Sequence, residues 1–298
     1  MASFLLWIDA FRLRTLPLAL SSIFLGSFLA YNEGVFSVSV AIFAVVTTLF
    51  LQISSNLAND YGDSKSGMDN DDRVGPLRSV QGGGISLLEM KRMMILFSVL
   101  SLVSGLALIY FANIDLGYSI LFLVIGIGAI AAAINYTVGK KPFGYIGWGD
   151  FFVFLFFGLV GVVGTYYLHT GVFSLDIFLP ASSVGMLSAA VLNLNNLRDR
   201  VGDEKSGKRT LVVAIGAKWA TIYHVFLIVG SVIIALLYIY LNYTSLYQFL
   251  FLVISPVLIF NIRKVIFNTE PCKLDSELKK IAMATLLFSV LFGVGMIL

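Results

Sequence analysis

The sequence predicts an all-α membrane protein, a polytopic bundle of nine transmembrane helices that forms a single domain over residues 1–298. Hydrophobic residues make up 58% of the chain and charged residues only 12%, whereas a soluble domain carries about 25% charged residues. The apolar residues form continuous runs of the length that a membrane-spanning helix needs, about 20 residues. Because these runs do not alternate with polar residues at every second position, a transmembrane β-barrel is excluded.

The elements follow from these runs in chain order. Residues 4–14 mix apolar side chains with Asp9, Arg12 and Arg14, which is typical of a helix lying at the membrane interface. Nine apolar runs come after it, each long enough to span the bilayer. The spans are expected at 16–32, 36–58, 91–112, 117–136, 150–168, 175–197, 217–241, 246–262 and 279–298.

The charges predict the orientation. All 20 Lys and Arg residues fall before the first span, after the second, fourth, sixth or eighth span, or within the first two residues of the span that follows. The opposite segments offer only uncharged or acidic residues, such as Glu33, Asp115 and Asp176, together with His169. Because Lys and Arg concentrate in cytoplasmic loops, we expect a cytoplasmic N-terminus and a C-terminus on the far side of the inner (plasma) membrane.

Two other features limit the function. The formal net charge of +3 is too small to indicate nucleic acid as a partner. The single cysteine, Cys272, excludes an intrachain disulfide.

Two cytoplasmic segments, 59–90 and 198–216, are long and rich in carboxylates. Each follows an Asn-Leu-x-Asn sequence at the end of a span, at 56–59 and at 193–196. Because these sequences lie four spans apart, we expect two parallel four-helix halves with a ninth helix added, and a site between the halves.

Polar side chains recur four residues apart in these segments, so that each pair shares one face of a helix. The pairs are Asn56 with Asp60, Asn59 with Asp63, and Asp199 with Asp203. Carboxylates at this spacing repel each other unless a cation lies between them. Mg²⁺ takes one or two protein carboxylates together with substrate phosphates, and it suits this pattern. A single such Asp also suits a solvated loop, but two matching clusters at span ends favour a functional site.

Basic residues accompany both acidic segments: Arg73 and Arg78 in the first, Lys205, Lys208 and Arg209 in the second, and Lys140 with Lys141 between them. Carboxylates that hold a divalent cation, interleaved with Lys and Arg, suit a polyanion such as a diphosphate. Membrane topology alone also explains basic cytoplasmic loops. Tyr136 precedes Lys140 by four residues and can place a hydroxyl or an aromatic face beside it, although an isolated Tyr at a helix end also serves as an interfacial anchor.

Over nearly its whole length the chain resembles the UbiA superfamily of membrane prenyltransferases, and within it the 1,4-dihydroxy-2-naphthoate polyprenyltransferase (MenA) branch. The stretches 56–84, 136–150 and 195–213 carry the resemblance. The superfamily's first signature, Asn-x-x-x-Asp-x-x-x-Asp, matches Asn59 and Asp63, but its third position is Gly67 here, and Asp69 is expected to take that role. The second signature, Asp-x-x-x-Asp, and a Tyr-x-x-x-Lys element match Asp199 with Asp203 and Tyr136 with Lys140.

The resemblance implies a nine-helix bundle whose active site is capped by cytoplasmic loops. It implies Mg²⁺-dependent transfer of a polyprenyl group from polyprenyl diphosphate to 1,4-dihydroxy-2-naphthoate, with loss of CO₂ and diphosphate. The product would be demethylmenaquinone, on the pathway to menaquinone (vitamin K2), and the isoprenoid tail would run between helices toward membrane lipid.

The implied roles fall into three groups. We expect the metal ligands to be Asn59, Asp63, Asp69, Asp199 and Asp203. We expect the catalytic residues to be Asp63, Asp199, Tyr136 and Lys140. We expect substrate to be bound by Asn56, Asp60, Arg73, Arg78, Lys140, Asn196 and Lys208.

Other functions share parts of this pattern. A prenyltransferase acting on 4-hydroxybenzoate would carry the same signature pairs, but the 136–150 stretch favours naphthoate. A CDP-alcohol phosphotransferase also uses membrane-embedded Asp clusters, but its Asp-Gly-x-x-Ala-Arg sequence is absent. An ion-coupled transporter would place polar residues near the midplane, whereas the acids here gather at span ends on one side.

Overall fold

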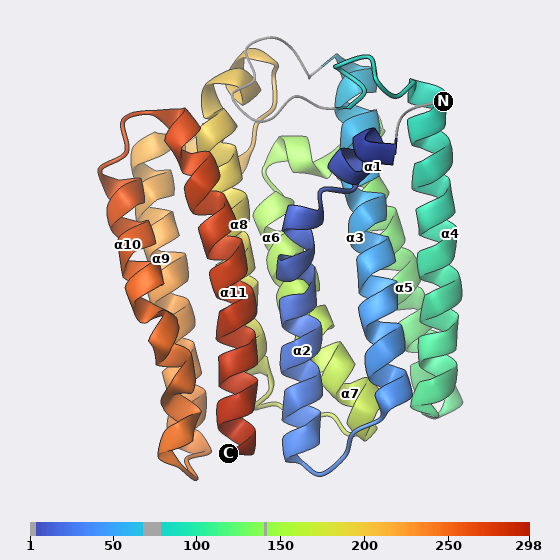
Figure 1. Cartoon of the computed structure of the whole chain (residues 1–298), viewed down its shortest axis with the longest axis vertical. Coiled ribbons are helices and arrows are strands. Elements are labelled where there is room, and N and C mark those ends of the chain that lie inside the picture. Colours follow the sequence, from blue (N-terminus) through green and yellow to red (C-terminus); the bar gives the residue numbers. More distant parts are fainter. Residues whose placement is uncertain (1–3, 68–78, 140–141) are drawn as a thin grey trace.

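The computed structural model describes residues 4–67, 79–139 and 142–298. Within these ranges, nine helices are long and apolar enough to cross a membrane, and none of the described residues forms a strand. The helices run side by side in a bundle, with the two chain ends at opposite ends of it (Figure 1). The predicted all-α fold class and the number of spans are confirmed.

Several spans consist of more than one helical segment. In chain order the elements are α1 (Phe4–Phe11), η1 (Leu13–Thr15), α2 (Leu16–Asn32), α3 (Val38–Ser66), α4 (Leu87–Ala112), α5 (Leu116–Asn135), η2 (Phe143–Ile146), α6 (Gly149–Val153), η3 (Phe154–Val163), α7 (Gly164–Thr170), α8 (Phe178–Lys205), α9 (Leu211–Leu241), η4 (Leu246–Ile254), α10 (Ser255–Ile266), η5 (Pro271–Lys273) and α11 (Leu274–Ile297).

The main difference from the predicted boundaries concerns α3 and α8. The sequence predicts spans that end at residues 58 and 197, but the two helices continue to Ser66 and Lys205. The acidic residues assigned to the starts of loops therefore lie on the last turns of helices that project beyond the apolar run. The prediction was wrong there because hydropathy marks where a helix leaves the bilayer, not where its hydrogen bonding ends.

The ends of several helices have local causes. Ser86 and Glu89 form a capping box at the start of α4, and the Thr210 hydroxyl accepts the Val213 N–H at the start of α9. Within α9 the backbone breaks at Gly216, where φ is 77°. The long straight part of α9 therefore starts at the residue from which the apolar span is predicted.

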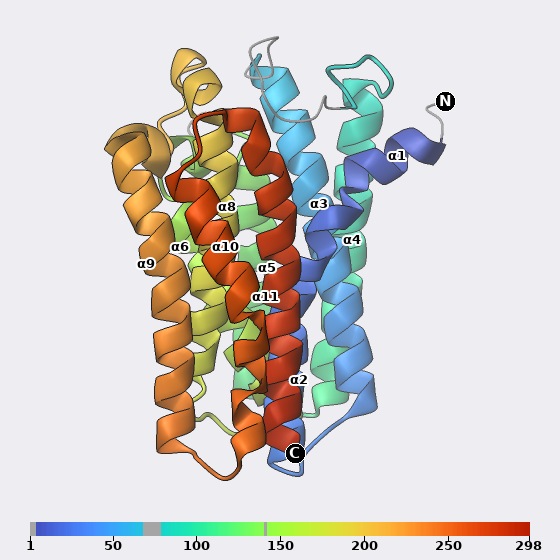
Figure 2. The ribbon, with the colours of Figure 1, turned by 60° about the vertical axis from the view of Figure 1, so that its left-hand side comes forward.

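The two halves pack in a related way. The second and third spans of each half form a pair, α3 with α4 and α8 with α9. The ninth span, α11, packs on α2, α8 and η4 (Figure 2). α1 leaves the bundle obliquely at the N-terminal end, as expected of an interfacial helix, and contacts α3.

The core is unevenly distributed. In the apolar window of α8, 72% of the residues are buried, against 6% in that of α5. α8 achieves this with small residues: a Cβ on Gly158 of η3 would lie 2.7 Å from Gly185 Cα of α8, so the two backbones touch. α8 is thus the central helix of the bundle. Packing along the rest of α8 holds the projecting end of this helix in place.

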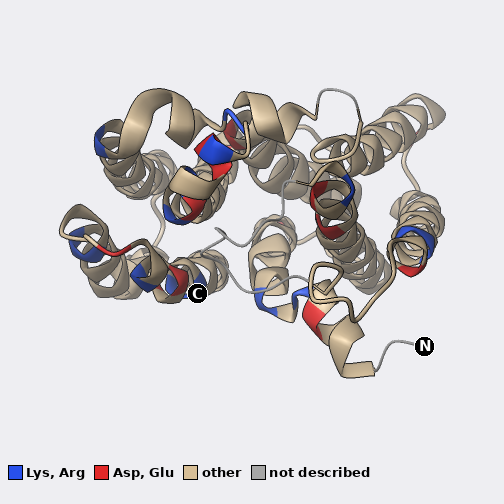
Figure 3. Cartoon of the chain, turned by 90° about the horizontal axis from the view of Figure 1, so that it is seen from above, with Lys and Arg blue, Asp and Glu red and all other residues tan. Residues whose placement is uncertain are grey.

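The charged residues gather where α3 and α8 project (Figure 3). The starts of α4, α9 and α11 and the ends of α3, α8 and α10 all lie at this end of the bundle (Figure 1). We call it the charged end.

Candidate active site

The last turns of α3 present the first acidic motif, which we define as Asn56, Asn59, Asp60 and Asp63. The helix stops at Gly67, whose φ of 71° is the left-handed conformation that ends many helices. Spacings of three and four residues place these side chains on neighbouring faces of the same two turns.

A glycine lets this part of α3 approach the segment after α5. A Cβ on Gly62 would lie 2.6 Å from the Thr137 carbonyl oxygen. The Thr137 hydroxyl lies 3.0 Å from the Ala58 carbonyl oxygen and 3.2 Å from Asn59 Oδ1, and it can donate to either. The Asn59 side chain is therefore oriented by a residue 78 positions away.

The last turns of α8 present the second acidic motif, which we define as Asn195, Asn196, Asp199 and Asp203. Asp199 and Asp203 are one turn apart and share a helix face. Beyond the helix, the Lys208 N–H donates to the Asp203 carbonyl at 2.8 Å, which keeps Lys208 close to the motif.

Both motifs border one cavity of about 480 Å³. Its polar lining includes Asn56, Asn59 and Asp63 of the first motif, all four residues of the second, and Arg12, Tyr136, Tyr145 and Lys208. The structure therefore brings together, across one space, residues that the sequence places at the ends of two helices four spans apart.

Lys208 joins the two motifs. Its Nζ lies 3.0 Å from Asp63 Oδ1 on α3 and 4.0 Å from Asp203 Oδ1 on α8. The same nitrogen lies 4.9 Å from the centroid of the Tyr145 ring, within the range of a cation–π contact. The Tyr145 hydroxyl donates to Asp63 Oδ1. A positive charge thus lies between carboxylates of the two halves.

Tyr145 was not singled out by the sequence analysis. It lies on η2, 82 positions from Asp63. The only signal for it in the sequence is its place within the 136–150 stretch.

The first motif is also tied to the N-terminal segment. Arg12 lies between α1 and η1 and donates from its guanidinium to Asp60. Asn56 donates to the Phe11 carbonyl at 2.9 Å and to Thr15 Oγ1 at 3.0 Å. Asp60 was predicted to bind substrate; it is not among the described residues that line the cavity, whereas its partner Arg12 is.

Asp199 of the second motif is held by a cation of its own helix. Arg198 is buried, and it donates from Nε to Asp199 Oδ1 at 2.9 Å and from Nη2 to Asp199 Oδ2 at 2.7 Å. Its Nη1 donates to Asp275 Oδ1 of α11 at 2.7 Å. Neither Arg198 nor Asp275 was a predicted site residue. In the sequence, Arg198 resembles the other basic residues expected in a cytoplasmic loop. No sequence pattern links α11 to this motif.

Tyr136 directly follows α5 and lines the cavity. Its ring packs edge-on against Phe143, with centroids 5.4 Å apart and planes at 90°. Burial, and then the nearby carboxylates of Asp150, Asp63 and Asp203, raise the pKa of its hydroxyl. The hydroxyl therefore stays protonated near neutral pH and presents a neutral donor beside an aromatic face.

Four predicted site residues lie outside the described residues, and their roles stay predictions. They are Asp69, Arg73, Arg78 and Lys140.

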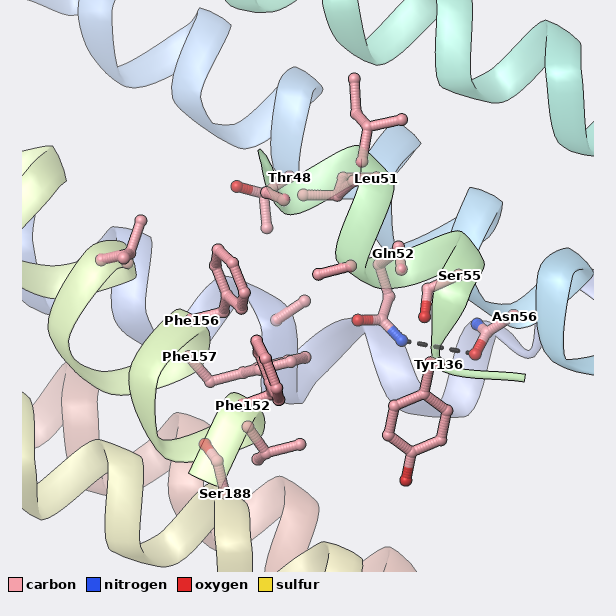
Figure 4. Close-up of a pocket in the computed structure, with 18 of the residues that line it drawn as sticks. Thr48, Leu51, Gln52, Ser55, Asn56, Tyr136, Phe152, Phe156, Phe157 and Ser188 are labelled. Carbon is pink, nitrogen blue, oxygen red and sulfur yellow. Dashed lines mark hydrogen bonds between the residues drawn. The ribbon is translucent and has the colours of Figure 1, made fainter. Parts of the chain in front are cut away.

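The part of the cavity drawn in Figure 4 is lined by both polar and aromatic side chains. Gln52 and Ser55 of α3 contribute polar groups, and Gln52 donates to Asn56 Oδ1 at 3.4 Å. Facing them, Phe152 and Phe156 form an aromatic wall, with ring planes 14° apart and centroids 6.2 Å apart. A cavity that combines charged side chains with aromatic rings suits a ligand with an anionic head and an apolar body.

The donor atoms fit Mg²⁺ that is shared with a phosphate ligand. Among the described residues, no three His, Cys, Asp or Glu side chains come together to hold a metal by themselves. Asn59, Asp63, Asp199 and Asp203 instead offer oxygens from opposite walls of the cavity. Mg²⁺ typically takes one or two protein carboxylates and completes its shell with phosphate oxygens and water, and the Lys208 ammonium lies between two of these carboxylates.

The sequence pattern that defines the UbiA prenyltransferase family matches residues 19–294. The 1,4-dihydroxy-2-naphthoate octaprenyltransferase of Escherichia coli (strain K12) is 43% identical over 292 residues, covering 98% of this chain and 95% of that protein. The enzyme of the same name from Haemophilus influenzae is also 43% identical, covering 98% of this chain and 96% of that protein.

Solved structures resemble the fold. The apo structure of a UbiA homolog from Aeropyrum pernix K1 has a TM-score of 0.68 and 16% identity, covering 95% of this chain and 97% of that one. A UbiA homolog from Archaeoglobus fulgidus bound to DMAPP and Mg²⁺ has a TM-score of 0.60 and 21% identity, covering 96% of this chain and 98% of that one.

Proposed function

This chain belongs to the UbiA prenyltransferase family, and from that premise we propose that it transfers a polyprenyl group from its diphosphate to 1,4-dihydroxy-2-naphthoate. The reaction forms a carbon–carbon bond between C1 of the prenyl group and the naphthalene ring. It releases diphosphate and the ring carboxyl as CO₂, and because no oxidant takes part, the product is demethylmenaquinol, the reduced form of demethylmenaquinone. The two relatives that are 43% identical over nearly the whole chain support the choice of acceptor.

One observation of the structure carries the proposal. Lys208 lies between Asp63 of the first motif and Asp203 of the second, so carboxylates of both halves converge on one cation. Carboxylates that converge from two helices, with a Lys among them, suit a divalent cation and a diphosphate together. The cavity continues from this point to the aromatic wall, where an apolar prenyl group fits.

We propose Asn59, Asp63, Asp199 and Asp203 as the ligands of Mg²⁺, with Asp69 assisting. The metal would stabilise the negative charge that develops on the diphosphate as the allylic C–O bond breaks. This assignment fits the donor set, because the residues supply only oxygen atoms and leave coordination positions for phosphate.

Cationic side chains of the protein stabilise the rest of the negative charge on the diphosphate. Lys208 and Arg12 line the cavity beside the motifs and can donate hydrogen bonds to the oxygens of the leaving diphosphate. Arg73, Arg78 and Lys140 are proposed to complete this ring of positive charge. Because these charges are in place before the bond breaks, they favour the separated charges over the intact diphosphate.

The allylic cation needs an environment that stabilises it without attacking it. Tyr136 presents a ring face and a protonated hydroxyl, and the aromatic wall of Phe152 and Phe156 lies farther along the same cavity. Aromatic faces attract cations and exclude water, which would otherwise capture C1. The electron-rich ring of the acceptor then attacks C1.

We place the charged end at the cytoplasmic face, because the described Lys and Arg residues gather there. Both water-soluble components, the diphosphate and the carboxylated naphthalene, would then meet the site from the cytoplasm. The isoprenoid tail is too long for the cavity and would run between helices into lipid.

Incubation of membranes that contain the protein with 1,4-dihydroxy-2-naphthoate, a radiolabelled polyprenyl diphosphate and Mg²⁺ tests the proposal. The expected result is labelled demethylmenaquinol, recovered as demethylmenaquinone after oxidation in air. Its formation should depend on Mg²⁺ and should not be suppressed by excess 4-hydroxybenzoate. Labelled 4-hydroxybenzoate product in place of demethylmenaquinone would contradict the acceptor while keeping the reaction class. Turnover unaffected by a strong chelator would contradict the metal assignment.

A further inference from the structure

The second acidic motif is connected to the ninth span by a buried guanidinium. Arg198 is 3% exposed and holds Asp199 through two hydrogen bonds of 2.9 and 2.7 Å. A third hydrogen bond, of 2.7 Å, runs from Nη1 to Asp275 Oδ1 at the start of α11. Among the described residues Asp199 lines the cavity, whereas Arg198 and Asp275 do not.

This arrangement does not follow from local helix geometry. Side chains at adjacent positions of a helix diverge and do not face each other. Arg198 nevertheless meets Asp199 with two donors, while Nη2 also donates to Asn195 Oδ1 at 2.9 Å. The guanidinium is planar and its donors are fixed in direction. The hydrogen bond to Asp275 therefore helps to fix the orientation of the guanidinium plane that contacts Asp199.

Asp275 is itself surrounded by positive charge. Besides Arg198, its carboxylate lies 2.9 Å from Lys279 Nζ and 3.9 Å from Arg14 Nη1. Lys279 is 52% exposed, in contrast to Arg198. Asp275 therefore links an exposed lysine on α11 to a buried arginine that touches the cavity's carboxylate.

We infer that Asp275 is a positioning residue, which supplies Arg198 with a second carboxylate and so leaves Asp199 available to a divalent cation. The inference rests on the proposed function, in which Asp199 is a metal ligand. Asp275 acts through Arg198 and does not itself reach the cavity.

The reason is electrostatic. A buried guanidinium needs a carboxylate partner, because an uncompensated charge in a low-dielectric interior is costly. If Asp199 were its only partner, a divalent cation at Asp199 would share that carboxylate and would also be repelled by Arg198. With Asp275 present, Arg198 keeps a full negative partner when a divalent cation shares the Asp199 carboxylate. Mutation of a residue that orients a metal ligand typically lowers metal affinity by about 10- to 100-fold.

The test measures binding of Mn²⁺ to the purified full chain in detergent with inorganic phosphate present, from the loss of the free-ion EPR signal relative to the same solution without protein. Asp275→Asn is expected to weaken Mn²⁺ binding by about tenfold. Asp275→Glu keeps the charge and is expected to retain most of the affinity. A metal titration is the readout because a purely structural role for Asp275 would lower stability without changing affinity.

Glu277→Gln is the matched control. Glu277 is a buried carboxylate on the same turn of α11, and it bonds to Asn261 Nδ2 at 3.2 Å and to Lys280 Nζ at 2.7 Å. Neither of these two partners belongs to the second acidic motif. Glu277→Gln is therefore expected to lower thermal stability about as much as Asp275→Asn while leaving Mn²⁺ binding unchanged.

Lys279→Gln provides a test of opposite sign that does not depend on tolerance of a buried change. Removing the exposed lysine leaves Asp275 a stronger partner for Arg198, so Mn²⁺ is expected to bind as tightly as in the unaltered chain or about twofold more tightly.

A double variant tests whether the two carboxylates act together. In Asp199→Asn, adding Asp275→Asn is expected to cause little further loss of Mn²⁺ affinity, because both changes act through the same carboxylate.

The outcomes separate this inference from the proposed function. If the unaltered chain binds Mn²⁺ and Asp275→Asn binds it equally well, or if Lys279→Gln weakens binding, the role of Asp275 is refuted and the metal assignment stands. If neither the unaltered chain nor any variant binds Mn²⁺, the metal assignment fails and the inference fails with it.

Discussion

The ends of α3 and α8 resemble each other in sequence but are neutralised in different ways. At the first motif, the partners come from far along the chain: Arg12 for Asp60, and Tyr145 with Lys208 for Asp63. At the second motif, Asp199 is held by its direct neighbour Arg198. Arg12 and Lys208 line the cavity, whereas Arg198 is buried behind it.

This difference indicates that the cations of the two motifs have different roles. Cations that border the cavity can turn from a carboxylate to a phosphate when substrate enters. A buried cation braced by α11 cannot leave its place, so it holds its carboxylate in one orientation. The first motif is therefore expected to respond to substrate, and the second to provide a fixed wall.

The largest expected effect removes one carboxylate from either motif. Asp63→Ala and Asp199→Ala are each expected to lower the rate of prenyl transfer by at least about 10³-fold, because each removes a preorganised charge from the reacting centre. The measurement is formation of labelled product in membranes. Size-exclusion chromatography of the detergent-solubilised variants checks that both proteins insert and fold. Substantial Mg²⁺-dependent activity in either variant would contradict the shared site.

The second prediction separates the two kinds of cation. Lys208→Gln is expected to raise the KM for polyprenyl diphosphate by about tenfold, the value of one charge-assisted hydrogen bond. It is expected to lower stability less than Arg198→Gln, because the Tyr145 hydroxyl still donates to the buried Asp63. Arg198→Gln is expected to lower the free energy of unfolding by about 3 kcal/mol, because it leaves the Asp275 carboxylate without its buried partner. Steady-state kinetics and unfolding in mixed micelles measure the two effects. The reverse pattern would remove the distinction between the motifs.

Arg12 combines both properties, and its replacement is expected to have an intermediate effect. Arg12→Gln removes a charged partner of the buried Asp60, so we expect a loss of about 1–3 kcal/mol in unfolding free energy. Because Arg12 also lines the cavity, the KM for the diphosphate should rise, but less than in Lys208→Gln. An unchanged KM would show that Arg12 serves Asp60 alone.

The smallest effect is expected from a cation that serves neither motif. Lys273 pairs with Glu270 at 2.7 Å, and both side chains are more than half exposed. Lys273→Gln is expected to change stability by less than about 0.5 kcal/mol and to leave prenyl transfer unchanged. A kinetic effect as large as that of Lys208→Gln would show that bulk positive charge, and not the placement of Lys208, attracts the substrate.

Much of the fold could be predicted because bilayer constraints are visible in composition. The run lengths predicted nine spans, and the described residues contain nine. The break at Gly216 falls where the apolar pattern predicted the span to start. The ends of α3 and α8 were predicted too early, since their last turns are polar and are supported by tertiary contacts such as that between Gly62 and Thr137.

The candidate site was predictable where its residues follow a local spacing. Asn59, Asp63, Asp199 and Asp203 repeat at four-residue intervals, and the structure places all four on one cavity. Tyr145, Arg198 and Asp275 follow no such spacing. Asp60 fits the spacing but is not among the described residues that line the cavity, and it pairs with Arg12 from the N-terminal segment.

The sequence by itself determined that this chain is a membrane bundle, which helix ends carry the candidate site residues, and which family signatures they match, because hydropathy and short-range spacing depend only on neighbouring residues. The tertiary structure alone decided which cation neutralises which carboxylate. That choice depends on where α1, η2 and α11 pack against α3 and α8, and each of these contacts joins residues far apart in the chain. For this reason Lys208 meets Asp63, and Arg198 meets Asp275.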